Sequence, residues 1–134
     1  VHAKVIAPDE VPDKEYPFVL TTGRLLEHWH TGSMTMRASI LNAIEPEPYV
    51  HVSNKDMRKN NLSQNEIVQL STRRGKVDVK VRFDRMIPEG MVFMPFCYEN
   101  APVNLLTNQA LDPDGKIPEL KYCAAKINKV TEKV

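Results

Sequence analysis

The chain has 134 residues, of which 42% are hydrophobic and 26% charged, as is typical of one globular domain with a real core. Lys plus Arg (18) and Asp plus Glu (17) nearly balance, so we expect neither nucleic acid nor a membrane surface as a partner. No apolar run approaches the roughly 20 residues of a membrane-spanning helix, and no signal peptide is visible. Cys97 and Cys123 could pair, but one possible bridge does not fix the redox compartment.

The first half of the chain predicts two strands separated by a helix. Residues 1–17 form a proline-rich lead-in, and the apolar residues that follow predict a strand over 18–22. A short helix is expected over 37–44, because the prolines that come next disfavour helical geometry in their neighbours. Residues 49–52 alternate as a second strand.

A second helix follows. Ser53 to Asp56 has the pattern of a helix N-cap, which predicts a helix ending at Lys59. Asn60 and Asn61 would end it in the left-handed conformation, and Asn65 would close another such turn.

The clearest hairpin joins strands over 67–72 and 76–83 around Arg73-Arg74-Gly75. Its basic turn is either a solvated tip or a docking point on another part of an enzyme.

The last third predicts strands over 91–96 and 121–127, one helical turn over 104–107, and fraying of 131–134. Strands therefore dominate, with two or three short helices and no recurring strand–helix–strand units. This pattern favours a mainly β fold, a β-barrel with helical insertions, over a doubly wound sheet.

The segment 21–35 follows the first strand and is the most informative part of the sequence. It holds two glycines, two histidines, Arg24, the single tryptophan and several hydroxyl residues. Glycine exposes bare backbone, N–H groups and hydroxyls donate to oxygens, and arginine offers a planar charged fork. We therefore expect a phosphate-bearing ligand here, although a surface ion pair would also account for Arg24 alone.

Other side chains of this segment have more than one interpretation. His28 and His30 could form a metal pair, but further ligands at motif spacing are missing from the sequence, so we predict no metal site. At least one of them should bind the ligand, and the other should be satisfied structurally. Trp29 either stacks on the ligand or packs the barrel, and Glu27 either orients a neighbour or forms a salt bridge.

Several separated segments resemble one known family. Residues 22–35 closely resemble the molybdopterin-dinucleotide-binding motif in the C-terminal domain of molybdenum and tungsten oxidoreductases. The nearest groups are the catalytic subunits of formate dehydrogenases and periplasmic nitrate reductases. Residues 52–56 resemble the family's strand–Asn-x-x-Asp–helix segment, and 95–96, 103–108 and 111–121 resemble its closing segments.

This resemblance implies a double-psi β-barrel and a molybdopterin guanine dinucleotide cofactor. In such enzymes two of these dinucleotides carry molybdenum or tungsten, held mainly by the rest of the enzyme. Phe96 matches an aromatic position near the substrate funnel, and Cys97 stands where a histidine is frequent. The positions that match cofactor contacts are Thr22, Gly23, Arg24, Leu25, Leu26, Glu27, His28, Trp29, His30, Thr31, Asn54, Asp56, Asn104 and Lys121.

The resemblance also implies that residues 1–134 are one domain, the C-terminal part of a larger catalytic subunit. Two cysteines cannot ligate a [4Fe–4S] cluster, which takes four thiolates, so we expect no catalytic residue in this chain and no activity by itself. The expected partners are the domains with the iron–sulfur cluster and metal ligand, and electron-transfer subunits. The expected compartment is the cytoplasm, with the periplasm as the alternative.

Two other hypotheses remain open on the sequence. The chain could be a free-standing small subunit of a formylmethanofuran dehydrogenase, which uses the same domain. It could also be a non-enzymatic double-psi barrel that recruits partners. The second hypothesis needs no phosphate-binding segment and leaves residues 23–32 unexplained.

Overall fold

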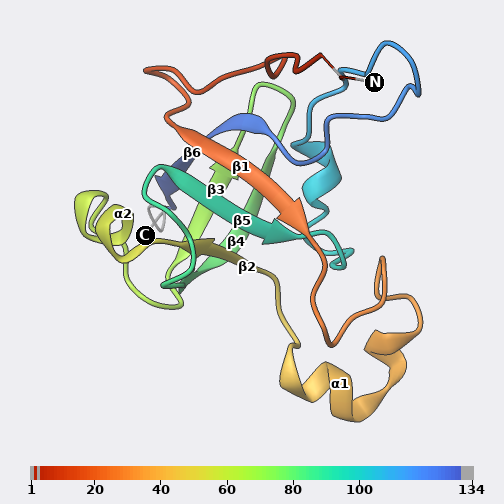
Figure 1. Cartoon of the computed structure of the whole chain (residues 1–134). Coiled ribbons are helices and arrows are strands. Elements are labelled where there is room, and N and C mark those ends of the chain that lie inside the picture. The colour runs from red at the N-terminus through yellow and green to blue at the C-terminus, as the bar shows by residue number, and fades with distance from the viewer. Residues whose placement is uncertain (1, 3, 131–134) are drawn as a thin grey trace.

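Six strands close into a barrel in the computed structural model, which describes residue 2 and residues 4–130 (Figure 1). Around the barrel the strands follow the order β1-β5-β2-β4-β3-β6. Their bounds are β1 Phe18–Gly23, β2 Tyr49–Val52, β3 Ile67–Ser71, β4 Lys76–Phe83, β5 Met91–Pro95 and β6 Cys123–Lys129.

Two of the six pairings are parallel. β1 pairs with β5, so that Gly23 lies beside Pro95, and β2 pairs with β4. The remaining pairings are antiparallel, and β6 closes the barrel between β3 and β1. The predicted mainly β fold with short helices and a double-psi barrel is confirmed by this closed arrangement.

The barrel interior is filled by alternating apolar residues of the strands. In β4, Val77, Val79 and Val81 are buried while the residues between them face outward. Burying each large aliphatic side chain contributes about 1.5–3 kcal/mol. The barrel is therefore a firm frame for whatever its ends carry, and its fully buried large side chains include Leu20, Val50, Val52, Val68, Leu70, Val81, Val92, Met94 and Leu106.

The helices agree with the sequence in one case and differ in the other. α2 (Asn54–Lys59) begins as predicted, because Ser53 Oγ accepts the Asp56 N–H at 3.1 Å. The predicted helix over 37–44 is instead two pieces, η1 (Thr35–Arg37) and α1 (Ser39–Ile44). Ala38 separates them because its backbone is extended, with φ −84° and ψ 107°.

Smaller differences lie in the last third of the chain. The single helical turn is η2 (Val103–Leu105), which begins one residue and ends two residues earlier than predicted. β6 begins two residues later than predicted, because Leu120 lies in a turn where its carbonyl accepts the Thr22 hydroxyl at 2.8 Å. The left-handed conformation predicted for the asparagines is present at Asn61 and Asn65, with φ of 53° and 66°, but Asn60 has φ −98° and is not left-handed. The predicted fraying of 131–134 lies outside the described residues.

The basic turn of the β3–β4 hairpin binds the chain's own lead-in, so its interpretation as a solvated tip is wrong. Glu10 accepts hydrogen bonds from Arg73 at 2.7 Å, from Arg74 at 2.8 Å and from the Ala124 N–H at 2.9 Å. Asp13 pairs with Arg73 as well. The lead-in, red in Figure 1, is thereby fastened across the tip of the hairpin.

Replacing the mostly buried carboxylate should destabilise the fold. We expect Glu10→Gln to lower the free energy of unfolding by roughly 2 kcal/mol, because it weakens charge-assisted hydrogen bonds and leaves Arg74 poorly compensated. Glu15→Gln is the matched control on the same segment, since Glu15 forms only an exposed ion pair with Lys126 at 3.6 Å. Urea unfolding measures both, and equal losses would contradict the assigned role.

The same carboxylate should make stability depend on acid. Burial raises the pKa of Glu10, but hydrogen bonds from Arg74, the Ala124 N–H and Arg73 outweigh it and hold this pKa below 4.5. A carboxyl with a depressed folded pKa stabilises above its unfolded pKa and loses that contribution as pH falls through the folded pKa. Below pH 4.5 the wild-type free energy of unfolding should therefore fall more steeply than that of Glu10→Gln. Urea titrations between about pH 5 and 2 measure the two slopes, and parallel curves would sink the assignment.

Candidate functional site

The site begins where β1 ends at Gly23. A Cβ at this position would lie 2.6 Å from Cε2 of Phe93 on the neighbouring strand, so only glycine fits without moving the ring. The Phe93 ring packs edge-on against His51 at a centroid distance of 5.4 Å. The Phe96 N–H continues the strand pairing by donating to the Gly23 carbonyl at 3.2 Å. The chain therefore leaves β1 with bare backbone beside residues 95–97.

Arg24, the next residue, is exposed and stands near Phe96. Its guanidinium carbon lies 5.8 Å from the centroid of the Phe96 ring. With the residues that the structure describes, Arg24 forms no ion pair, whereas Arg73, Arg74 and Arg82 are each paired with a carboxylate. An unpaired guanidinium is available for a phosphate or another planar acceptor.

A cleft of about 480 Å³ opens on the same side. It brings together three of the residues that the sequence singled out, Thr31, Phe96 and Asn104. Sequence reasoning missed the cleft's charged side chains: Arg37 was assigned only to a helix, although its place just after the motif was a usable signal. The other lining residues are Gly32, Ser33, Met36, Cys97, Tyr98, Glu99, Pro102 and Val103.

The two walls of this cleft meet at Gly32 and Cys97. Gly32 has φ +75°, and a Cβ there would lie 2.8 Å from the Cys97 carbonyl oxygen, so glycine allows this close approach. Burial raises the pKa of the Cys97 thiol to about 11, which keeps it neutral near pH 7. Cys97 and Cys123 are both buried as free thiols, so they do not form the bridge that the sequence left open.

His28 is a structural residue of the segment that follows β1. It is 1% exposed, and its Nε2 lies 2.7 Å from the Glu45 carbonyl oxygen. Its Nδ1 lies 3.2 Å from Thr35 Oγ1, which also accepts the Trp29 N–H. Of the two histidines, His28 is thus the satisfied one, and His30, which is exposed with φ 48°, stays the predicted ligand contact.

The neighbours of His28 face outward. Trp29 is 61% exposed and meets His30 edge-on at 4.6 Å, so it does not pack the barrel. Leu26 is 98% exposed, while Leu25 and Glu27 are half-buried. Contact of these residues with a cofactor stays a prediction.

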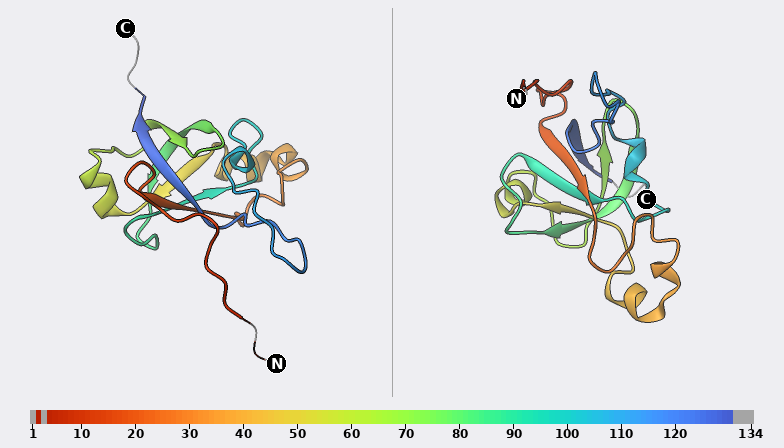
Figure 2. Two further views of the ribbon diagram at one scale, coloured as in Figure 1. Left: turned by 90° about the horizontal axis from the view of Figure 1, so that it is seen from above. Right: turned by 45° about the vertical axis from the view of Figure 1, so that its right-hand side comes forward.

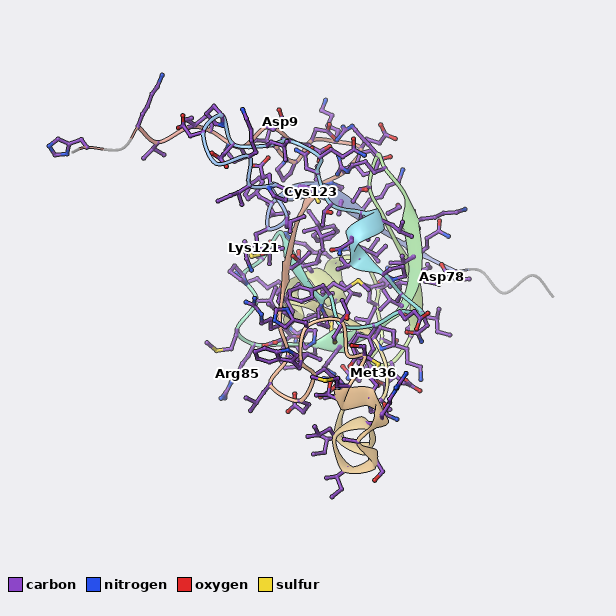
Figure 3. The ribbon with its side chains drawn as sticks, turned by 90° about the vertical axis from the view of Figure 1, so that its right-hand side faces the viewer. Asp9, Met36, Asp78, Arg85, Lys121 and Cys123 are labelled. Carbon is purple, nitrogen blue, oxygen red and sulfur yellow. The ribbon has the colours of Figure 1, made fainter. Side chains whose placement is uncertain are left out.

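Hydrogen bonds of Thr22 join the end of β1 to the turn that contains Leu120 and Lys121. The Lys121 ammonium donates to the Thr22 carbonyl at 3.1 Å, and the Thr22 hydroxyl donates to the Leu120 carbonyl at 2.8 Å. Figure 3 labels Lys121 on the flank of the barrel and Met36 at the base of α1. The structure therefore places Lys121 beside Gly23, where the resemblance expects a cofactor contact.

Asn54 and Asp56 lie at the other end of the barrel. Asp56 accepts the Ser53 hydroxyl at 2.7 Å and the Gly90 N–H at 2.9 Å, so its carboxylate is already used within the fold. Gly23 pairs with Pro95, and Gly90 comes five residues before Pro95. Five residues span about 16 Å along a strand, so Asp56 lies far from the Gly23 end. The structure does not bring these two residues to the cleft, and their predicted nucleotide contact stays a prediction.

Within residue 2 and residues 4–130, no group of three or more His, Cys, Asp or Glu side chains is arranged to hold a metal ion. The helices described there include none with the length and apolar character needed to cross a membrane.

A closed barrel that presents bare backbone, an unpaired arginine and a cleft at one end defines a ligand-binding barrel domain. Residues 18–124 match the family described as "Molydopterin dinucleotide binding domain". The chain therefore belongs to this family, and it is a domain of the kind found in formate dehydrogenase- and nitrate reductase-type oxidoreductases.

Curated relatives agree with this membership. The F420-dependent formate dehydrogenase subunit alpha of Methanocaldococcus jannaschii is 45% identical over 121 residues, which are 90% of this chain and 18% of the relative. The periplasmic nitrate reductase of Campylobacter fetus subsp. fetus is 43% identical over 124 residues, 91% of this chain and 13% of the relative. The chain thus spans less than a fifth of these relatives.

A solved structure shares the fold. Acetylene hydratase from Pelobacter acetylenicus matches with a TM-score of 0.77 over 87% of this chain and 19% of its own. Since the sequence identity is 22%, this likeness shows the fold alone.

The tight approach at Gly23 gives a test of the site's frame. We expect Gly23→Ala to lower the free energy of unfolding by roughly 1–3 kcal/mol, because the added methyl displaces the Phe93 ring. Gly115→Ala is the control: its Cβ would meet Asp112 Oδ2 at 3.4 Å, close to ordinary contact. Thermal unfolding compares the two variants, and a neutral Gly23→Ala would show that this glycine is not required by packing.

Proposed function

We propose that the β1 end and the adjoining cleft hold one molybdopterin guanine dinucleotide in an oxidoreductase of the formate dehydrogenase type, with the nitrate reductase type as the alternative. The observation that carries the proposal is the meeting of Gly23, unpaired Arg24 and the Phe96-lined cleft at one end of the barrel. The relatives named formate dehydrogenase and nitrate reductase support it at 45% and 43% identity.

The residues present fit such a group. A pterin dinucleotide combines phosphates with flat ring systems, so it needs charged donors and apolar or aromatic faces together. Arg24, Arg37 and Lys121 supply positive charge, and a larger set of uncharged groups completes the site. These are the hydroxyls of Thr31 and Ser33, the amide of Asn104 and the rings of Phe96 and Trp29.

The chain's own part in the reaction is binding and orientation. When bound, the cofactor supplies two-electron chemistry at its metal, while a protein domain fixes its position and electrostatics. Arg24 would hold phosphate oxygens, Asn104 and Lys121 would orient the organic part, and Phe96 would exclude water from the cleft. The neutral Cys97 thiol would add an apolar wall and no negative charge.

The finer points are proposals as well. Other domains of a larger catalytic subunit would supply the iron–sulfur cluster and the metal ligand, and electron-transfer subunits would take the electrons. Formate is the proposed substrate because formate dehydrogenases stand among the relatives at 45% identity. The cytoplasm is the proposed compartment, and the periplasmic nitrate reductase among the relatives supports the alternative.

Removing the Arg24 guanidinium should weaken cofactor binding selectively. We expect Arg24→Ala to lower the affinity for the dinucleotide by about tenfold to a hundredfold, the effect of losing one charge-assisted contact of roughly 1.5–3 kcal/mol. The measurement is the guanine nucleotide released per mole of purified, denatured enzyme, together with titration of guanosine diphosphate as a probe.

The control is Arg85→Ala, which removes an exposed arginine at the other end of the barrel. Its neighbour Asp84 places it there, because the Asp84 N–H donates to the Val52 carbonyl just before α2. The control variant should leave nucleotide content and affinity unchanged. If Arg24→Ala behaves like Arg85→Ala, the proposal loses its main support and the recruiting-module hypothesis gains.

A further inference from the structure

Residues 24–48, here called the arm, leave the barrel at the end of β1 and return at β2. Figure 1 and the right-hand view of Figure 2 show α1 standing away from the strands. Neither η1 nor α1, each described in full, contains a buried residue. A six-residue helix is not stable in water by itself, so packing against something else must stabilise α1.

The arm buries a polar side chain and exposes several apolar ones. His28 is 1% exposed and bonds Thr35 and the Glu45 carbonyl, which also accepts the Tyr98 hydroxyl at 3.1 Å. Five of the arm's large apolar side chains face outward, whereas such side chains are most often buried. Their exposed fractions are 98% for Leu26, 61% for Trp29, 67% for Met34, 76% for Ile40 and 57% for Ile44.

The charge pattern of residues 28–44, the middle of the arm, matches a buried interface. Arg37 is the one Asp, Glu, Lys or Arg residue between His28 and Ile44, in a chain where 26% of residues are charged. Interface centres are depleted of charged residues and enriched in aromatic residues and Met, whereas solvent-exposed helices carry charges on their outer face. Hydrogen bonds at His28 already fix the arm's shape, so it presents a preformed apolar surface.

We propose that the outward face of the arm is covered by another part of the same polypeptide, a larger catalytic subunit. This rests on the proposed function, in which the chain is one domain of such a subunit. The formate dehydrogenase relatives have room for this occupant, since the matched region is 18% of their length. The arm also forms one wall of the cleft through residues 31–33 and 36–37, so the covering part closes the cofactor site.

Hydrogen exchange in the native full-length enzyme tests the proposal. The amides of Asn42 and Glu45 bond the carbonyls of Ala38 and Leu41 within α1. If the arm is covered, these amides should exchange at least about tenfold more slowly than an unstructured peptide. Exchange as fast as in a free peptide would overturn the proposal.

A charge placed in the interface should remove this protection. Ile40→Asp should restore fast exchange over 39–45, and the milder Ile44→Ser should do so in part, because each opposes burial of the apolar face. Met86→Asp, a 78% exposed residue on the turn after β4, is the matched control and should change nothing. Unaltered protection in both arm variants would count against the interface.

Photo-crosslinking from position 40 identifies the occupant. A crosslink to the same polypeptide outside residues 1–134 supports the proposal, whereas one to a second copy or to another polypeptide overturns it. Nucleotide content is measured on the same samples. A bound dinucleotide with an unprotected arm rejects only the interface, and a protected, crosslinked arm without dinucleotide rejects only the proposed cofactor site.

Discussion

The parallel pairing of β1 with β5 is the constraint on which the rest of the structure depends. It places Gly23 beside Pro95 and lets the Phe96 N–H bond the Gly23 carbonyl, so two segments distant in the sequence leave the barrel side by side. One segment carries Arg24 and the arm, and the other carries Phe96, Cys97 and the loop to Asn104. The cleft exists because these two segments diverge from the same strand ends. A parallel pair needs a long crossover, which here includes β2, α2, β3 and β4.

Local chemistry made much of the fold predictable. The N-cap at Ser53, the left-handed conformation of two asparagines and the alternating hairpin all depend on neighbours in sequence, and each is found as predicted. Where distant contacts decide, prediction failed. Arg73 and Arg74 have the sequence pattern of a solvated tip, but in the fold the lead-in places Glu10 and Asp13 against them.

The site divides in the same way. The importance of Gly23 and Arg24 was visible from the sequence, because a strand followed by Gly-Arg and hydroxyls has a local chemical meaning. The sequence did not show which of the two histidines is buried. His28 is satisfied by the Glu45 carbonyl, and only the fold of the arm brings this residue near. Arg37 was assigned to a helix over 37–44 because the break at Ala38 was not predicted, and its place just after the motif was the one local signal that it lies at the cleft.

The distribution of paired and unpaired arginines separates what holds the fold from what serves the site. Arg73, Arg74 and Arg82 lie against carboxylates, and Arg82 also stacks on Tyr49 with its guanidinium carbon 3.8 Å from the ring centroid. Within the described part of the chain, Arg24 and Arg37 form no ion pairs, and both stand at the mouth or wall of the cleft.

Arg58 and Arg85 are also exposed and unpaired among the described residues, but they lie on α2 and on the turn after β4, and neither lines the cleft. In a chain whose charges nearly cancel, carboxylates were available for every arginine. Arg24 and Arg37 have no carboxylate partner among the described residues and stand beside one cleft, which supports the proposal that a ligand supplies the negative charge there. The exposed apolar side chains of the arm support, in the same way, the proposal that the rest of a larger protein covers it.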